Sequence, residues 1–242
     1  MINLPRPGLG RLLVTPLLVA AGLAALYLYV SLTPARLGDA FVVNQRFILS
    51  RLVQHLQIVG ISFALAAAIA VPLGVLLAQT GPALRAPVFL VANLGQAVPS
   101  IGILALGLTF FGIGTRGPIL ALVVYAVLPI LRNTIVGLDG VDPGVVEAAR
   151  GIGMTRLQTL FRVQLPLASP VLFAGLRVAL VLVVGTATLA NFIGGGGLGD
   201  LIAAGSVDRP HPLWVGAGIV SALALMLDWG LGLIERAVTP RT

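Results

Sequence analysis

Long apolar runs constrain this chain more than any motif does. A transmembrane helix needs about 20 mostly apolar residues, and runs of that length cover residues 12–32, 52–78, 87–111, 118–138, 167–190 and 213–234. The chain is 58% hydrophobic and 10% charged, far from the average of soluble domains. Continuous runs exclude an outer-membrane barrel, whose strands would be about 10 residues of alternating character. We therefore predict an all-α, polytopic membrane protein with six transmembrane helices.

The first run follows Arg6 and Arg11, as in a signal peptide. Its apolar stretch exceeds the usual length of about 7 to 15 residues, and no clear A-x-A site follows it. We therefore expect an uncleaved anchor. The predicted organisation is an N-terminal transmembrane anchor and external loop over residues 1–49, then a core over residues 50–242 with a polar loop at residues 139–166.

The arginines predict how the chain is oriented. The chain has no lysine, so all 15 basic residues are arginine. If both termini and the polar loop share one side, that side receives more arginines than the other, and Arg177 falls within a run. Because basic residues favour the cytoplasm, we place both termini and the loop there. The cytoplasmic set is Arg6, Arg11, Arg85, Arg132, Arg150, Arg156, Arg162, Arg236 and Arg241, and the external set is Arg36, Arg46, Arg51, Arg116 and Arg209.

Several classes of function can be excluded. The net charge of +7 comes from scattered arginines that flank apolar runs, which argues against nucleic-acid binding. There is no cysteine, and His55 and His211 are too far apart in sequence to suggest a metal pair. A chain without lysine cannot supply the phosphate-binding lysine of a nucleotide loop. We predict no catalytic residue and no metal site in this chain.

The polar loop carries the signals of a short helix. Asp142 can cap its first turn, Pro143 suits the first helical position, and Gly151 and Gly153 end it. So short a helix is not stable alone, and its apolar stripe needs a groove. Position outside the membrane favours a groove in another protein, and packing on its own bundle is the alternative. The stripe consists of Val145, Ala148, Ala149 and Ile152.

The same loop resembles the coupling motif of the permease subunits of bacterial ABC importers. The resemblance rests on Glu147-Ala148-Ala149, Gly153, Val163 and Leu165-Pro166, with Val163 where the family more often has isoleucine. It extends from about residue 50 to the last run, and residues 1–49 carry no recognisable motif. The segments similar to the betaine, choline and osmoprotectant branch are 96–100, 128–134 and 185–194.

The resemblance implies a multi-pass subunit of the bacterial inner membrane. Its partners would be a cytosolic ABC ATPase dimer, a second permease subunit that is the same or a related chain, and a periplasmic or lipid-anchored substrate-binding protein. The chain itself would be no enzyme and would hold no cofactor, since ATP and Mg would be bound by the ATPase. Arg150 and Arg156 could pair with acidic groups of the ATPase or only mark the cytoplasmic side. The expected ATPase-coupling residues are Glu147, Ala148, Ala149, Arg150, Gly153, Arg156, Leu165 and Pro166.

Polar groups inside the runs mark a candidate translocation pathway. Gln96, Pro99 and Ser100 interrupt the third run, so we expect a kink or break with free carbonyls beside a cavity. Arg177 would face an internal vestibule or reach the cytosolic interface. Threonine, asparagine and aromatic members of the set could equally serve in helix packing. The full set is Gln96, Pro99, Ser100, Phe111, Tyr125, Arg177, Thr186, Thr188, Asn191 and Phe192.

The glycines allow two interpretations. The run over residues 194–199 lacks the strand-turn-helix context of a phosphate loop. It would instead provide flexibility or a close approach near an external gate, with a plain turn as the alternative. Gly102, Gly107, Gly112 and Gly114 are expected at close helix contacts.

The cargo is the least constrained property. A quaternary ammonium compound would be selected by aromatic cages, and the chain is only 6% aromatic, so we expect the selective site in the binding protein. Glycine betaine or choline is the predicted cargo, and methionine or a sulfonate is the alternative. An ion-coupled carrier is a further alternative, although no acidic residue is central and no internal repeat is visible.

Overall fold

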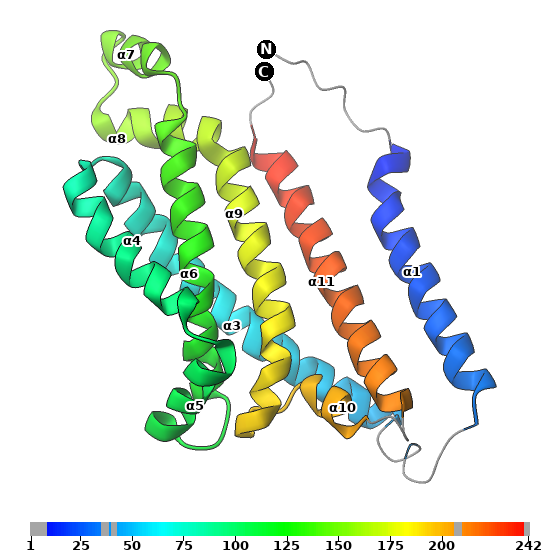
Figure 1. Ribbon diagram of the computed structural model, residues 1–242. Helices are drawn as coiled ribbons and strands as arrows, with labels where there is room; N and C mark the ends of the chain where they lie inside the picture. The colour runs from blue at the N-terminus through cyan, green and yellow to red at the C-terminus, as the bar shows by residue number, and fades with distance from the viewer. Residues whose placement is uncertain (1–8, 35–38, 40–42, 206–209, 240–242) are drawn as a thin grey trace.

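The computed structural model describes residues 9–34, 39, 43–205 and 210–239, and in these ranges it contains helices and no strand. The helices form an elongated bundle with two short helices, α7 and α8, at one end (Figure 1). The order is α1 (Leu9–Leu32), α3 (Gln45–Ala78), α4 (Pro82–Ala97), α5 (Ser100–Phe111), α6 (Arg116–Asp139), α7 (Pro143–Gly151), α8 (Arg156–Thr159), the π-helical η1 (Leu160–Gln164), α9 (Leu165–Thr186), the 3₁₀-helical η2 (Ala187–Ile193), α10 (Gly199–Ala204) and α11 (Pro210–Val238).

The predicted transmembrane runs all correspond to helices. Five helical segments are long and apolar enough to cross a membrane, and the number reaches six if the bent pair α4 and α5 is counted as one span. The all-α polytopic prediction is therefore confirmed. The third run is the exception to a straight helix, because α4 and α5 meet at 93°.

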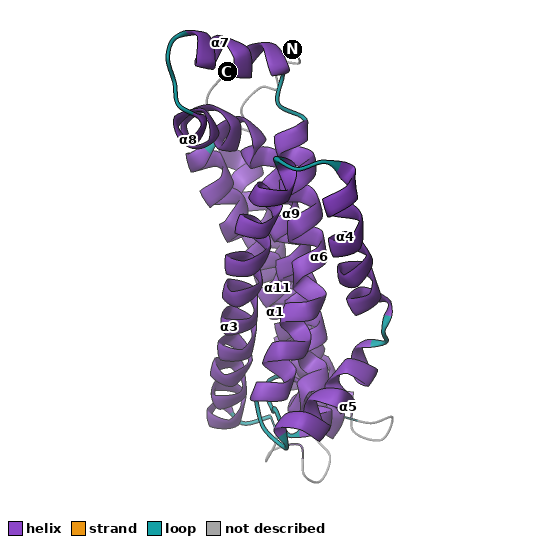
Figure 2. Ribbon diagram, turned by 90° about the vertical axis from the view of Figure 1, so that its left-hand side faces the viewer, coloured by secondary structure: helices purple, strands orange, loops and turns teal. Residues whose placement is uncertain are grey.

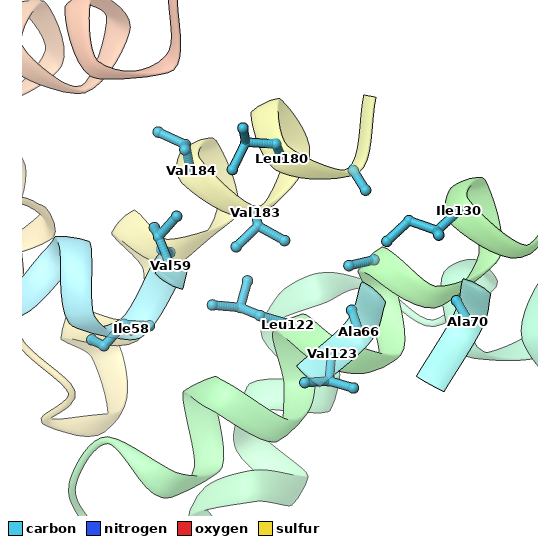
Figure 3. Close-up of a cluster of buried hydrophobic side chains, with 14 of the residues drawn as sticks. Ile58, Val59, Ala66, Ala70, Leu122, Val123, Ile130, Leu180, Val183 and Val184 are labelled. Atoms are coloured by element: carbon cyan, nitrogen blue, oxygen red, sulfur yellow. The ribbon is translucent and has the colours of Figure 1, made fainter. Parts of the chain in front are cut away.

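The core lies between α3, α6 and α9. Its buried side chains are mostly alanine, valine, isoleucine and leucine, which interdigitate from the three helices (Figure 3). Lipid tails are as apolar as these side chains, so close packing holds such helices together. The labelled members are Ile58, Val59, Ala66 and Ala70 of α3, Leu122, Val123 and Ile130 of α6, and Leu180, Val183 and Val184 of α9.

Small residues set the helix crossings. A Cβ on Gly74 of α3 would lie 2.7 Å from the Cβ of Thr134 on α6. A Cβ on Gly175 of α9 would lie 2.5 Å from the Cβ of Asn133. Such separations are too short for real atoms, so glycine lets these backbones approach. This pattern is typical of helix contacts within membranes.

Helix α1 is a peripheral element that packs on α11. Only 6% of its membrane-length window is buried, whereas the corresponding value for α6 is 56%. Leu26 of α1 fills the space beside Gly218 of α11. Near the C-terminal end of α1 and the N-terminal end of α11, Nδ1 of the buried His211 lies 3.0 Å from the Asp39 carboxylate.

The bundle has two distinct ends. The start of α1, the end of α11, α7 and α8 lie at one, called the α7 end, and α5 and α10 lie at the other, called the α5 end (Figures 1 and 2). The common side predicted for the termini and the loop agrees with this arrangement, although the terminal residues themselves lie outside the described ranges. The side chains of Arg6, Arg11, Arg36, Arg209 and Arg241, used in that prediction, also lie outside the described part of the chain.

Candidate functional site

The predicted loop helix exists and begins where expected. Asp142 is the N-cap of α7, its side chain accepts a hydrogen bond of 2.8 Å from the Gly144 backbone N–H, and Pro143 is the first helical residue. Gly153 follows the helix with φ of +90°, a conformation that favours glycine because a Cβ would be strained. Capping, together with the packing of Val146 and Ala149 on the bundle, supports this nine-residue helix.

Most of α7 is uncovered. Glu147, Ala148 and Arg150 are exposed, and Ala149 alone is buried, at 6% exposure. The predicted apolar stripe is therefore divided, because Val146 instead of Val145 packs toward the bundle. Among the described residues no ion pair involves Glu147, Arg150 or Arg156.

The segment after α7 has a capping box that sequence analysis overlooked. The Thr155 hydroxyl accepts from the Gln158 backbone N–H, and the Gln158 side chain accepts from the Thr155 N–H. The pattern of threonine followed three residues later by glutamine was the available signal. A π-helical turn, η1, then joins α8 to α9 just before Leu165 and Pro166. Proline cannot donate to the carbonyl of residue 162, and this missing bond permits the wider turn.

Apolar side chains remain exposed at this end as well. Ile152 is 77% exposed and Leu157 is 67% exposed. We call the exposed side chains of residues 143–161 the α7–α8 surface. Its members are Val145, Glu147, Ala148, Arg150, Ile152, Arg156, Leu157 and Phe161.

The predicted break in the third run is confirmed at Val98 and Pro99, which separate α4 from α5. The freed carbonyl of Val98 accepts a hydrogen bond from the Tyr125 hydroxyl of α6. Gln96 donates from Nε2 to the Tyr125 backbone carbonyl at 2.9 Å. Ser100 is the first residue of α5. The break is thus stabilised by protein groups, as a break at membrane depth requires.

The second group of pathway residues lies at the α5 end. Thr186 ends α9, and Thr188, Asn191 and Phe192 belong to η2, so the apolar run continues as a 3₁₀ helix where we expected an α-helix. Asn191 donates from Nδ2 to the Gly199 carbonyl at 3.2 Å, a packing contact. In the described part of the chain, no hydrogen bond links Phe111, Phe192 or Thr188 to Gln96 or Tyr125.

Both aromatic pathway candidates at this end are exposed. Phe111 is 51% exposed and Phe192 is 63% exposed. Their segments are joined by a hydrogen bond of 3.2 Å from the Gly114 N–H to the Ile193 carbonyl. Gly112 and Gly114 have φ of +72° and +137° and open space around them, so the expectation of close packing was wrong for both. Gly107 does pack closely, against Gly117.

Arg177 is separate from both groups. Its guanidinium binds Asp228 of α11 through Nε and Nη2, each at 2.7 Å, and its Nη1 lies 3.6 Å from Glu235. The fork geometry suits a carboxylate and offsets the cost of placing a charge within an apolar helix. A cavity of about 610 Å³ opens beside this pair, lined by Ala174, Arg177, Val178, Val181, Leu182 and Asp228. Asp228 was not anticipated as the partner, because the two positions lie on different helices.

The glycine run is a clamped loop. The Gln54 side chain donates from Nε2 to the Gly195 carbonyl at 2.9 Å and accepts from the Gly197 N–H at 3.1 Å. A Cβ on Gly196 would lie 2.4 Å from the Gln54 Oε1. The close approach that we expected is therefore present.

An ion pair supports this clamp. Arg51 of α3 lies 2.9 Å from the Asp200 carboxylate of α10, and it also donates to the Gln54 Oε1 at 2.8 Å. Burial raises the pKa of Asp200, and the charge of Arg51 opposes that effect. Sequence analysis counted Arg51 only among the external arginines and did not name Gln54, since nothing in the neighbouring residues indicates the contacts that they make with the glycine loop and α10.

The structure therefore divides the pathway candidates into three groups that lie apart from one another. Gln96, Pro99, Ser100 and Tyr125 meet at the helix break, the residues of η2 lie at the α5 end, and Arg177 pairs with Asp228. Among the described residues no three His, Asp or Glu side chains gather as a metal site would require.

Comparison with known proteins gives the context. The family model for the binding-protein-dependent transport system inner membrane component matches residues 70–240. The carnitine transport permease OpuCB of Listeria monocytogenes is 44% identical over 189 residues, which cover 78% of this chain and 86% of that protein. The osmoprotectant import permease OsmW of Salmonella typhimurium is 40% identical over 204 residues, covering 82% and 94%.

Solved structures agree with the sequence relatives. An inward-facing MetNI methionine ABC transporter matches with a TM-score of 0.69 and 27% identity, covering 80% of this chain and 97% of that chain. An amino acid ABC transporter matches with a TM-score of 0.63 at 22% identity, covering 78% and 93%, which shows the fold alone. With a family model matched over most of its length and relatives of at least 40% identity, this chain belongs to the binding-protein-dependent transport system inner membrane components, the permease subunits of ABC importers.

Proposed function

We propose that this chain is the transmembrane permease of an ATP-driven importer for an osmoprotectant such as glycine betaine, carnitine or choline. The observation that supports it most is the α7–α8 surface, which presents Glu147, Arg150 and exposed apolar side chains at one end of a membrane bundle. A surface of this kind outside the bilayer suits a soluble partner. The relatives named for carnitine, betaine and choline supply the cargo class.

The partner at this surface is a cytosolic ATPase dimer, which binds ATP and Mg in place of this chain. Nucleotide-driven closure of the dimer would displace α7 and bias the membrane helices between two states. Arg150 and Arg156 are free to meet acidic groups of the partner, since the described residues offer them no carboxylate. In this arrangement the α7 end, with the start of α1 and the end of α11, lies in the cytoplasm.

The α5 end then faces the substrate-binding protein. Phe110, Phe111 and Phe192 are exposed there, but no ring contact among them is found in the described residues, so they do not form the cage that a quaternary ammonium requires. Selection would therefore reside in the binding protein, with this permease and a second copy or related chain forming the passage. Methionine is the cargo of the MetNI relative, whose 27% identity supports it less than the 44% of the carnitine permease supports an osmoprotectant.

Uptake into proteoliposomes tests the proposal. The permease is reconstituted with the ATPase and binding protein encoded beside it, and ATP-dependent uptake of radiolabelled glycine betaine, carnitine, choline and methionine is measured. Glu147→Arg should lower uptake at least about tenfold, because a reversed charge on the contact helix removes the coupling. Asp142→Asn is the matched control, since asparagine caps α7 equally well.

Two results would overturn the proposal. Uptake without ATP or the ATPase would contradict an ATP-driven importer. Methionine uptake without uptake of any quaternary amine would contradict the cargo while leaving the architecture.

A further inference from the structure

Arg85 joins three helix ends at the α7 end of the bundle. It lies in the first turn of α4, and its Nη1 reaches the Asp139 carboxylate of α6 at 2.5 Å. Its Nε donates to the Leu77 carbonyl at 2.9 Å and its Nη2 to the Ala78 carbonyl at 2.7 Å, both in the last turn of α3. One side chain therefore links the end of α3, the start of α4 and the end of α6.

The charge of Arg85 does not stabilise α4, the helix to which it belongs. A cation in the first turn opposes the helix dipole of its own helix. The last carbonyls of α3 and the carboxylate of Asp139 provide the compensating acceptors, and a planar guanidinium can serve them together. The side chain is 22% exposed and that of Asp139 is 45% exposed, so water can reach the pair and allow it to open and close.

Helix α4 lies at the edge of the bundle, where Val88, Phe89 and Ala92 pack on the core while remaining partly exposed. It has no buried residue, and its contacts with other elements are chiefly with α6. At its far end Gln96 donates to the Tyr125 carbonyl, and the Tyr125 hydroxyl donates to the Val98 carbonyl. Polar contacts with α6 therefore secure both ends of α4, and the break at Pro99 follows directly.

Helix α5 continues from that break to the α5 end. It turns by 93° from α4 and packs closely on α6 where Gly107 meets Gly117. The turn after it donates from Gly114 to the Ile193 carbonyl of η2. Helix α4 thus leads through the break to α5, which lies at the end of the bundle opposite α7 (Figure 2).

Asp139, the partner of Arg85, lies next to α7 in the sequence. It is the last residue of α6, and α7 begins four positions later at Pro143. We propose that the ion pair of Arg85 and Asp139 is the joint that passes displacement of α7 to α4, and through the Pro99 break to α5. Both are positioning residues, and the inference rests on the proposed function.

The test measures substrate transported per ATP hydrolysed in the full complex with its ATPase and binding protein. Asp139→Asn removes the charge and keeps the shape, and Arg85→Gln removes the fork. Each should lower the ratio about tenfold while the ATPase still co-purifies and hydrolyses ATP. Asp139→Glu should restore part of the ratio, which a role in folding alone would not predict. Arg236→Gln, an exposed arginine on α11, is the control and should keep the wild-type ratio.

Each other outcome has a distinct meaning. A wild-type ratio in Asp139→Asn would overturn the joint and leave the proposed function standing. Loss of the ATPase from the Asp139→Asn complex would also overturn it, because the residue would then act in docking. A wild-type complex without ATP-driven uptake of any cargo would overturn the proposed function and, with it, this inference.

Discussion

The α7–α8 surface and the glycine loop at the α5 end of the bundle are built in opposite ways. At the α7 end, Ile152 and Leu157 are more than half exposed, and the charges of α7 have no ion-pair partners among the described residues. At the α5 end, the loop over Gly195, Gly196 and Gly197 is buried and bound by Gln54. Under the proposed function, the α7–α8 surface is available to another molecule, whereas the glycine loop at the α5 end satisfies its polar groups within the chain.

Because of this difference, we expect substitutions in the glycine loop to affect the stability of the fold and substitutions in the α7–α8 surface to affect assembly with a partner. A loop whose backbone is clamped by a side chain belongs to the folded bundle, so changes in it should lower the free energy of unfolding. An exposed surface contributes little to that free energy, so changes in it should appear only when a partner is present. Substitutions at the two ends should therefore give different kinds of defect.

Gly196→Ala should produce the largest loss of stability. Its φ is +70°, and the added Cβ would lie 2.4 Å from the Gln54 Oε1, so both backbone strain and a clash result. We expect a loss of about 2 to 4 kcal/mol, measured by thermal unfolding in detergent. Gly60→Ala on α3 is the control, since a Cβ there meets nothing within 4 Å. Equal stability of the two variants would contradict the clamped loop.

Gln54→Leu should have the next largest effect. It removes the hydrogen bonds to the Gly195 carbonyl and from the Gly197 N–H, each worth about 1 kcal/mol. Gln57→Leu changes an exposed glutamine on the same helix and should leave the melting temperature nearly unchanged. If the two substitutions shift the melting temperature alike, Gln54 does not secure the loop.

Thr155→Ala should have a smaller and local effect. The capping box of α8 would lose its hydroxyl acceptor, at a cost of about 1 kcal/mol. Hydrogen exchange should become faster over residues 155–164 and stay unchanged in α3. Thr155→Ser keeps the acceptor and should retain slow exchange. Global destabilisation by the alanine would show that the α7 end is part of the folding core.

Leu157→Ser should have the smallest effect on stability and a clear effect on assembly. The side chain is 67% exposed, so unfolding should change by less than about 0.5 kcal/mol. Recovery of the ATPase with the purified permease should fall severalfold. A large loss of stability without a change in ATPase recovery would reverse the proposed comparison of the two ends.

Local signals predicted much of this architecture. The apolar runs predicted the spans, Pro99 predicted the break, and Asp142 with Pro143 predicted the start of α7, because each signal acts within a few residues. The same reasoning failed where local geometry is ambiguous. The end of α9 becomes a 3₁₀ helix, and Gly112 and Gly114 supply positive φ instead of close contacts.

The contacts that organise the candidate site join distant positions. Arg85 and Asp139 are 54 residues apart, Arg177 and Asp228 are 51 apart, and Gln54 and Gly197 are 143 apart. Nothing in the neighbouring residues indicates such pairs. They follow from how the helices cross, which is set by close packing across the whole bundle.

Cysteine labelling tests the central claim about the two ends most directly. The chain has no cysteine, so Ile152→Cys and Ile113→Cys introduce single thiols at the α7 end and at an 83% exposed position of the α5 end. A membrane-impermeant maleimide should modify Ile152→Cys readily in the permease alone and at least about fivefold more slowly when the ATPase is bound. The modification of Ile113→Cys should not respond to the ATPase. Unchanged labelling of Ile152→Cys in the ATPase complex would contradict the assignment of this surface to the partner.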